Sequence, residues 1–336
     1  QVLSSNALIP AALPPHLVAV FAGATSGIGE ATLKAFVKFA VSPRIYLLAR
    51  NTVSAQCVVA DCHAFNANAE FEIVKADLSS VREIDRACDA IKAKEQAVNL
   101  VVMSMGEYTC SVSPEGLHLF MATVYYNRIR ITQNLLLLLT HASLTTPLAR
   151  VLDVAGGTKE GPVDTSDLAA LHIPFRSLCG HLLSMHTLAL ESLADQAPTV
   201  SFVHDFPGAV VTHLYGSLPR WAGVGMRMLE MMLRLLERWV CVSIEECGER
   251  HVFMSTSAKY SPIEGKAVGV GLIEGLEASY PTENVRRCVY SVNWDCESAE
   301  QHVTELLKGM REIGVKELVW EHTNEQFREA RSGMNL

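Results

Sequence analysis

Residues 18–30 of this 336-residue chain read Val18-Ala-Val-Phe-Ala-Gly-Ala-Thr-Ser-Gly-Ile-Gly-Glu30. An apolar run, a glycine-rich turn and a helical stretch follow one another, which is the order of a strand, a loop and a helix. In that arrangement the backbone N–H groups of the turn and the positive end of the helix face a dinucleotide pyrophosphate. This segment therefore predicts a dinucleotide-binding fold.

Each glycine of this turn has a separate steric role. Gly23 permits the tight turn, Gly27 lets the backbone approach the phosphates, and Gly29 lets the helix pack closely on the strand. A glycine-rich loop without a ligand is the competing interpretation, but residues 44–50 supply a second strand where a βαβ unit requires one. At its end stands Arg50 in place of an Asp or Glu that would accept the ribose 2′-hydroxyl of NAD. A guanidinium suits a 2′-phosphate, so we predict NADP(H) as the cofactor.

The wider pattern alternates apolar and amphipathic stretches, which is typical of an α/β fold with a doubly wound parallel sheet of about seven strands. We expect strands near residues 17–22, 44–49, 71–75, 98–103, 150–155, 199–204 and 266–272. We expect helices near residues 27–40, 52–67, 80–94, 115–139, 177–196, 224–240 and 244–256.

The spacing of the three glycines resembles the short-chain dehydrogenase/reductase family, and further landmarks agree over residues 16 to about 260. Asp77 and Leu78 follow a predicted strand where the family has its adenine-contacting Asp. Residues 103–106 match the family's Asn-Asn-Ala-Gly stretch, of which only the glycine is kept. Residues 207–212 match the Pro-Gly-x-Val-x-Thr segment that holds the nicotinamide in the family.

The resemblance implies a Rossmann-like fold and a set of cofactor-binding residues drawn from these landmarks. They are Gly23, Thr25, Ser26, Gly27, Ile28, Gly29, Arg50, Asp77, Leu78, Ser104, Gly106, Pro207, Gly208, Val210 and Thr212.

The family's four catalytic positions hold other residue types in this chain. The resemblance places Val124 at the Asn position, Gly156 at the Ser, Cys179 at the Tyr and Leu183 at the Lys. In the family the Tyr gives a proton to the carbonyl oxygen, the Lys lowers its pKa and the Ser orients the carbonyl. Residues 160–196 contain no Tyr or Lys, so a small shift of register does not restore the pair.

Hydride addition to a ketone generates an alkoxide, so another group has to supply or replace the missing proton. The nearest titratable candidates are Cys179, His181, His186 and Tyr126. Each also has a simpler interpretation, because a helical Cys, His or Tyr is more often a packed side chain than a catalyst. These four residues are hypothetical proton donors.

Several functions remain open on this sequence. The first expectation is an NADPH-dependent reductase of a carbonyl, imine or iminium in a bulky apolar natural-product intermediate, a polyketide or an alkaloid. An iminium needs no acid, because hydride arrival yields a neutral amine. The alternatives are a redox-neutral cyclase, pericyclase or isomerase with NADP(H) as a bound scaffold, and a nucleotide-binding pseudoenzyme. Tyr125-Tyr126 followed by Arg128, residues 202–208 and residues 248–251 resemble the fungal, secondary-metabolite branch of the family.

The chain is expected to divide at residue 283. Residues 1–283 form the dinucleotide-binding domain, with a lid over residues 213–243, and residues 284–336 form an extension packed on it. Charges at three- or four-residue spacing within the lid leave a wide apolar face that contains several methionines. Ordinary core packing and a dimer or membrane-surface face are the other interpretations of that face. In the extension we expect a helix that is capped by Ser298 and runs through Arg311, and a second helix from Glu321 to Arg331. Trp294 and Trp320 are expected to anchor the extension on the domain.

The composition of the chain argues against several classes of binding partner. A formal net charge of −8 without a clustered basic run argues against nucleic acid. Nine scattered Cys residues without a CxxC pair or zinc spacing predict reduced thiols, a cytoplasmic location and no metal site. No apolar run reaches the roughly 18 residues of a membrane span. A homodimer through helices 115–139 and 177–196 stays open, because the extension or the lid helix would compete for that face.

Overall fold

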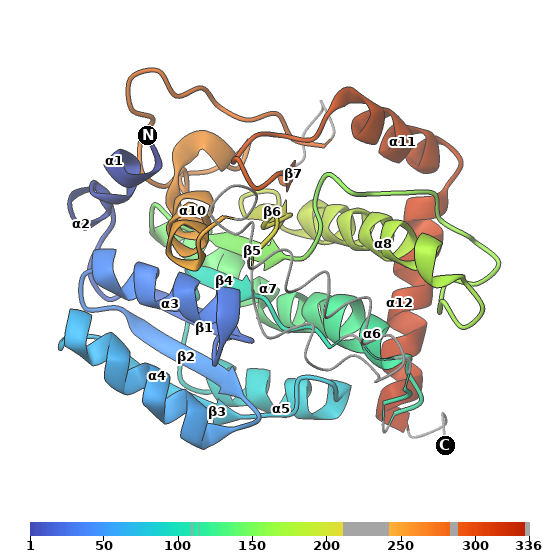
Figure 1. Ribbon diagram of the computed structural model, residues 1–336, viewed down its shortest axis with the longest axis horizontal. Helices are drawn as coiled ribbons and strands as arrows, with labels where there is room; N and C mark the ends of the chain where they lie inside the picture. The colour runs from blue at the N-terminus through green and yellow to red at the C-terminus, as the bar shows by residue number, and fades with distance from the viewer. Residues whose placement is uncertain (108, 110, 114, 211–241, 283–287, 333–336) are drawn as a thin grey trace.

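The computed structural model describes residues 1–336 apart from residues 108, 110, 114, 211–241, 283–287 and 333–336 (Figure 1). Within the described residues, seven parallel strands form one sheet in the order β3-β2-β1-β4-β5-β6-β7. The strands are β1 (Val18–Ala22), β2 (Arg44–Ala49), β3 (Glu70–Lys75), β4 (Leu100–Met103), β5 (Arg150–Val154), β6 (Ser201–Asp205) and β7 (Val289–Val292). The strand order reverses between β1 and β4, which is the point where doubly wound sheets bind ligands.

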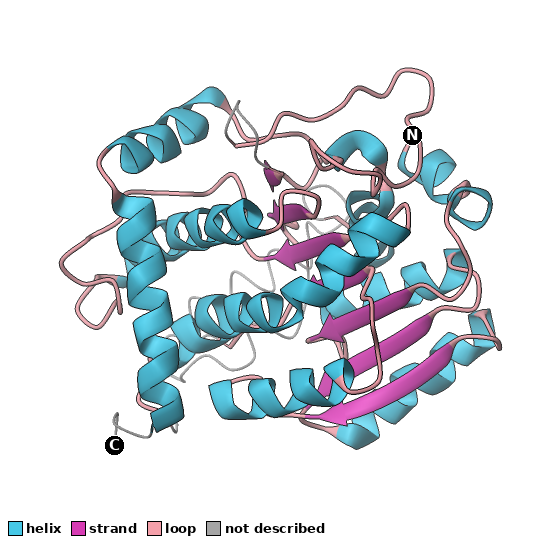
Figure 2. Ribbon diagram, turned by 180° about the vertical axis from the view of Figure 1, so that it is seen from behind, coloured by secondary structure: helices cyan, strands magenta, loops and turns pink. Residues whose placement is uncertain are grey.

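Helices cover both faces of the sheet, as Figures 1 and 2 show from opposite sides. One face carries α1 (Val2–Asn6), α2 (Ile9–Ala12), α3 (Gly27–Phe39), α4 (Thr52–Phe65) and α10 (Ile244–Thr256), followed by the 3₁₀ turn Ala258–Tyr260. The other face carries α5 (Val81–Lys92), α6 (Leu119–Met121), the π-helical turn Ala122–Tyr126, α7 (Asn127–Thr145) and α8 (Phe175–Gln196). Outside these lie α11 (Gln301–Glu312) and α12 (Val315–Ser332). The expected doubly wound fold is confirmed.

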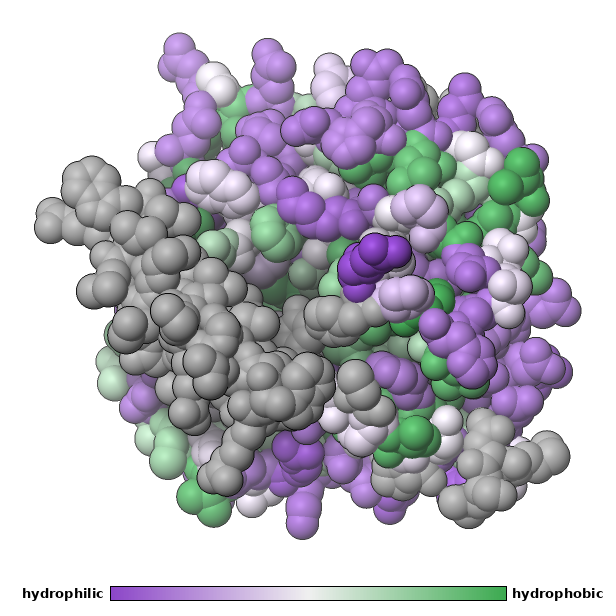
Figure 3. Space-filling model, turned by 45° about the vertical axis from the view of Figure 1, so that its right-hand side comes forward, coloured by the Kyte–Doolittle hydropathy of each residue, from purple (hydrophilic) through white to green (hydrophobic). Residues whose placement is uncertain are grey.

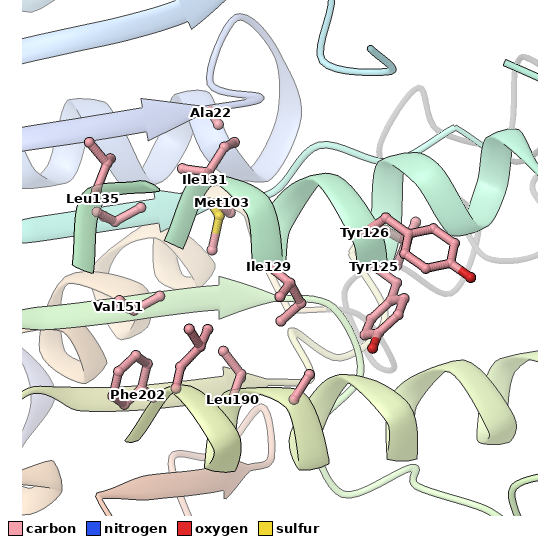
Figure 4. Close-up of a cluster of buried hydrophobic side chains, with 14 of the residues drawn as sticks. Ala22, Met103, Tyr125, Tyr126, Ile129, Ile131, Leu135, Val151, Leu190 and Phe202 are labelled. Atoms are coloured by element: carbon pink, nitrogen blue, oxygen red, sulfur yellow. The ribbon is translucent and has the colours of Figure 1, made fainter. Parts of the chain in front are cut away.

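Each face of the sheet packs against helices and has its own hydrophobic core. The strands between the two cores are buried on both sides, so most of their residues are apolar. Figure 4 shows part of one core, where strand side chains meet those of α7 and α8. Its labelled members include Ala22, Met103, Ile129, Ile131, Leu135, Val151, Leu190 and Phe202. Fully burying one such side chain stabilises the fold by about 1.5–3 kcal/mol.

The expected strand over residues 266–272 is wrong. In that segment Val268 and Val270 form only isolated bridges, and Gly269 has a φ of +83°, outside the strand region. The alternation of Val and Gly in this segment has the two-residue period of a strand, but the backbone does not adopt the strand conformation. The seventh strand is β7, which lies in the segment expected to be an extension, so residues beyond 283 complete the sheet as well as pack on it.

The other boundaries differ in detail. The helix expected over 298–311 begins one turn later, at Gln301, with Glu300 rather than Ser298 at its N-cap. The helix expected over 321–331 begins at Val315, because Val315 and Val319 are buried and extend its apolar face. The helix expected over 224–240 and nearly all of the lid lie outside the described residues. Among the described helices, none combines the length and the apolar character needed to cross a bilayer.

The C-terminal helix α12 crosses α8, α5 and the π-helical turn (Figure 1). The hydroxyl of Tyr125 lies 2.5 Å from Thr323 Oγ1, and the hydroxyl of Tyr126 lies 2.7 Å from His322 Nε2. Phe327 is buried against Tyr126. The extension is therefore part of the core and touches the turn that holds Val124.

Candidate cofactor and active site

The glycine turn after β1 packs closely against the residues that follow β4. Gly23 has a φ of +86°, and a Cβ there would lie 2.4 Å from the backbone nitrogen of Met105. A Cβ on Gly29 would lie 2.2 Å from the side-chain oxygen of Ser104, which itself donates a hydrogen bond to the Gly23 carbonyl. Gly27 also has a positive φ, of +60°. The turn conformation and the close helix packing that the sequence predicts for these glycines are both present.

The N-terminus of α3 is open to an anion. Ser26 is the N-cap residue, but its side chain makes no capping hydrogen bond. The first N–H groups of a helix have no partner within the helix, so those of Gly27 and Ile28 remain available. Thr25, Gly27 and Ile28 are half-buried and Ser26 is exposed. This open turn fits a pyrophosphate, and its N–H groups would hold it.

Two further positions flank the turn at the carboxyl ends of β2 and β3. Arg50 is exposed and makes no hydrogen bond or ion pair with the part of the chain that the structure describes. The carboxylate of Asp77 accepts bonds from the backbone and hydroxyl of Ser79, and the Leu78 carbonyl accepts one from Asn127. Arg50 directly follows β2, whose Leu48 pairs with Ala22 of β1, so its backbone lies beside the turn and its guanidinium would suit a phosphate on the ribose.

The Pro207-Gly208 segment follows β6. Gly208 has a φ of +80°, and a Cβ there would lie 2.9 Å from the Cβ of Trp294. Arg250 lies with its guanidinium 5.0 Å from the centre of the Trp294 ring and donates a hydrogen bond to the Trp294 carbonyl. Val210 is described and half-buried, whereas Thr212 lies outside the described residues. The segment is therefore held from the β7 side by a tryptophan.

The four positions that the sequence resemblance assigns to catalysis lie on three elements of the fold. Val124 lies in the π-helical turn, Gly156 follows β5, and Cys179 and Leu183 lie on α8. A Cβ on Gly156 would lie 2.6 Å from a methyl carbon of Leu183. The leucine therefore fills the space in which a side chain at position 156 would begin.

The hypothetical proton donors are each held in a different environment. His181 is buried, its Nδ1 accepts a bond from the backbone N–H of Asp164, and burial lowers its pKa. Tyr126 is buried against His322, and burial raises the pKa of its phenol. His186 is also buried. Cys179 is half-buried, and desolvation raises the pKa of its thiol above the ordinary value, which keeps it in the neutral form. The structure does not gather these four residues into one cluster.

The sequence interpretation missed a buried polar cluster next to Gly156. His186 Nε2 lies 2.7 Å from a carboxylate oxygen of Asp153, whose other oxygen pairs with Arg128. The His186 ring stacks on that of His204, with centres 4.8 Å apart. His204 Nε2 accepts a bond from the backbone N–H of Gly156 at 3.3 Å.

The same cluster continues through the other nitrogen of His204 to Thr187 at 2.8 Å, and from the Thr187 hydroxyl to Glu160 at 2.8 Å. Burial would raise the pKa of Asp153, but His186 and Arg128 hold it below the usual range. Burial and the neighbouring His186 lower the pKa of His204. The available signal was a polar residue inside each of two apolar strands, Asp153 in β5 and His204 in β6.

Figure 3 shows the side of the molecule toward which the strands point, with a hollow floored by hydrophobic side chains next to the grey residues. A separate cavity of about 650 Å³ lies between α11 and residues 280–282, and none of the predicted site residues lines it. Among the described residues, no group of His, Cys, Asp and Glu is arranged to hold a metal ion.

Known proteins resemble this chain in sequence and in fold. An oxidoreductase of Emericella nidulans is 33% identical over 315 residues, which are 92% of this chain and 92% of that protein. A short-chain dehydrogenase/reductase of Stachybotrys chartarum is 27% identical and covers 72% of this chain and 73% of its own length. The crystal structure of an L-sorbose reductase from Gluconobacter frateurii, complexed with NADPH and L-sorbose, has a TM-score of 0.54 at 15% identity. It covers 78% of this chain and 98% of its own. No family model matches the chain.

Proposed function

The chain belongs to the short-chain dehydrogenase/reductase family, in its fungal oxidoreductase branch, and on that premise we propose that it is an NADPH-dependent reductase. Its substrate is a bulky apolar natural-product intermediate that carries a carbonyl or an iminium group. The relatives' names support oxidoreductase activity, and the NADPH of the sorbose reductase supports the cofactor class.

The observation that carries the cofactor assignment is Arg50, which follows β2 and has no partner among the described residues. Ala22 pairs with Leu48, so the backbone of Arg50 lies beside the open glycine turn, and its guanidinium would give a charge-assisted hydrogen bond to a phosphate on the ribose. The turn and the helix N-terminus would hold the pyrophosphate, and the Pro207-Gly208 segment would hold the nicotinamide. When bound, NADPH supplies a hydride.

The same site favours an electrophile that needs no proton. Leu183 and Gly156 offer no titratable group, and the thiol of Cys179 is a weak acid whose pKa burial raises further. A carbonyl would develop an alkoxide beside Leu183, whose aliphatic atoms donate no hydrogen bond to it. An iminium loses its charge on reduction, so these surroundings favour the transition state. Reduction of an iminium is therefore the preferred reaction within the proposal.

A redox-neutral cyclase or isomerase is the second candidate, and the contact between Leu183 and Gly156 favours it. Aliphatic atoms fill the place of the hydrogen-bonding serine, so the pocket binds by shape rather than by polar contacts. Shape is what holds a flexible substrate in a reactive conformation. In that case NADP(H) forms one wall of the site.

The decisive experiment measures binding and turnover on the same protein. Calorimetry with NADP⁺, NADPH, NAD⁺ and NADH tests the cofactor, and we expect the phosphorylated pair to bind more tightly. NADPH is then mixed with a cyclic iminium and with the ketone of matching size, and loss of nicotinamide absorbance is followed. Oxidation of NADPH with the iminium supports the reductase. A rearranged product without NADPH oxidation, detected by mass spectrometry, would replace it with the cyclase.

A further inference from the structure

A thiol, an imidazole and a carboxylate are aligned at the carboxyl end of β6, outside the catalytic positions described above. Cys247 Sγ lies 3.6 Å from Nδ1 of His251, and His251 Nε2 lies 2.6 Å from Oδ2 of Asp205. Cys247 and His251 are one turn apart on α10, so both side chains project from one face of the helix. Asp205 is the last residue of β6.

The alignment fixes the protonation of His251. One ring nitrogen points at a carboxylate oxygen and the other at sulfur, so both positions favour an attached hydrogen. Burial by itself would lower the pKa of His251, but Cys247 and Asp205 raise it to about 10. The ring is therefore an imidazolium at neutral pH, and its Nδ1–H group lies against Sγ of Cys247.

The other cysteines provide the contrast. Burial raises the pKa of Cys62, Cys88 and Cys296 to about 12 in each case, so these three remain thiols. None of the three has a histidine ring nitrogen within hydrogen-bonding distance in the part of the chain that the structure describes. Cys296 is 3% exposed and Cys247 is 2% exposed, which makes Cys296 the matched comparison.

We propose that Cys247 is a modification site, a cysteine aligned with His251 and Asp205 whose sulfur reacts with hydrogen peroxide. The sulfur attacks one peroxide oxygen, an S–O bond forms and the O–O bond breaks. Sulfur loses two electrons and becomes a sulfenic acid, while the peroxide is reduced. The leaving hydroxide takes a proton from the His251 imidazolium and departs as water, and the ring takes up the proton of the thiol, so charge and atoms balance. This site acts independently of the proposed reductase reaction.

Burial sets the size of the oxidant. Cys247 is 2% exposed, which favours a reagent of nearly the size of water over a branched hydroperoxide or an aromatic disulfide. The proposed oxidant is therefore a small one. Cys179 is the opposite case, because it is only half-buried but has no activating base among the described residues.

The test exposes the full chain to hydrogen peroxide for increasing times, stops the reaction with catalase, and unfolds the protein in an alkylating reagent. Peptide mass spectrometry then gives the fraction of each cysteine that escaped alkylation because it was oxidised. We expect Cys247 to be lost at least about tenfold faster than Cys296, in keeping with the reactivity of cysteines paired with an imidazolium. Equal rates for Cys247 and Cys296 in the unmodified chain would overturn the proposal, and this comparison needs no variant.

Two variants and a second oxidant sharpen the result. His251→Gln and Asp205→Asn should slow the oxidation of Cys247 about tenfold toward the rate of an ordinary thiol. His63→Gln, on a helix that carries Cys62, is the control and should change nothing. Cumene hydroperoxide should leave Cys247 intact. Unchanged oxidation in a folded His251→Gln protein, judged by near-ultraviolet circular dichroism, would contradict the role of the imidazolium.

Discussion

Nε2 of His186 lies 2.7 Å from Oδ2 of Asp153, and the other oxygen of the same carboxylate pairs with the guanidinium of Arg128. All three side chains are buried. Arg128 also donates to the Val154 carbonyl at the end of β5 and to backbone carbonyls at the end of β4. This buried cluster thus ties the ends of β4 and β5 to α7 and α8.

The first prediction concerns the stability that this carboxylate supplies. Asp153→Asn leaves Arg128 buried without its counter-charge, and breaking a buried pair in this way costs about 3–5 kcal/mol. Because the pKa of Asp153 is held below the unfolded value of about 4, its contribution is present above that pH and is lost as the pH falls further. Urea unfolding between pH 3 and pH 7, in steps of about one unit, measures both effects. Asp89→Asn, at an exposed site on α5, is the control. If the free energy of unfolding of Asp153→Asn falls as steeply below pH 4 as that of the unmodified chain, the carboxylate does not have this role.

Arg50→Glu tests the cofactor. A charge-assisted hydrogen bond contributes about 1.5–3 kcal/mol, so the affinity for NADPH should fall about tenfold to a hundredfold. Affinity for NADH should hold or rise, since a carboxylate can accept the ribose hydroxyl. Calorimetry with both nucleotides measures the change in preference. Lys38→Glu, at the far end of α3, has the same charge change and should leave the ratio unaltered. An equal loss of affinity for NADPH and NADH would show that Arg50 does not bind the 2′-phosphate.

The sheet was predictable because its signals are local. The run of Val18 to Glu30 contains a strand, a turn and a helix start within one stretch, and the left-handed conformation of Gly23 is the one its position requires. The seventh strand was not predictable, because β7 is only four residues long and lies in a segment that is distant in sequence from β6, with which it pairs. Which segment pairs with an edge strand depends on the whole fold, and alternating Val and Gly near residue 268 supplied a misleading local pattern.

The candidate site also contains some features that the sequence predicts and others that it does not. The glycine turn and Arg50 could be named from spacing, because the strands, the turn and the helix that carry them follow one another in the sequence. The cluster of Arg128, Asp153 and His204 could not, because its members come from α7, β5 and β6 and meet only in the folded chain. A charged residue in an apolar strand signals a buried partner but does not identify it.

Cys179→Ala tests whether the thiol at the family's tyrosine position donates a proton. Loss of a general acid lowers the rate by about 10² to 10⁴, whereas loss of a packing contact near the pocket lowers it less than about tenfold. We expect the smaller effect, because burial raises the pKa of this thiol and an iminium needs no acid. Steady-state kcat and KM on the iminium substrate decide the matter. Cys57→Ala, at an exposed position on α4, is the control. A drop of a hundredfold or more in kcat alone would instead make Cys179 the donor.

The position of α12 predicts a monomer. This helix lies on α8, and its Asn324 accepts a bond from Gln133 of α7 at 3.0 Å, so it covers part of the helical surface through which family members pair. Analytical ultracentrifugation of the whole chain at micromolar concentration should give a single species of monomer mass. Leu137→Glu changes a leucine on α7 that is 79% exposed and should not alter that mass. A dimer that Leu137→Glu dissociates would show that α7 still forms an interface.

Trp294 is expected to position the nicotinamide without touching the phosphates. Its ring lies under the guanidinium of Arg250, its Cβ occupies the space beside Gly208, and it follows β7 directly. Trp294→Ala removes this support, so the Pro207-Gly208 segment gains freedom that must be lost again when the nicotinamide binds. The affinity for NADPH should fall about tenfold, the equivalent of about 1.4 kcal/mol. The affinity for adenosine 2′,5′-bisphosphate, which lacks the nicotinamide, should stay within about twofold, because Arg50 and the glycine turn are unchanged. Ile313→Ala, at a residue that is 78% exposed, is the control for loss of an apolar surface group. If both ligands lose affinity equally, the tryptophan stabilises the whole domain rather than one end of the cofactor site.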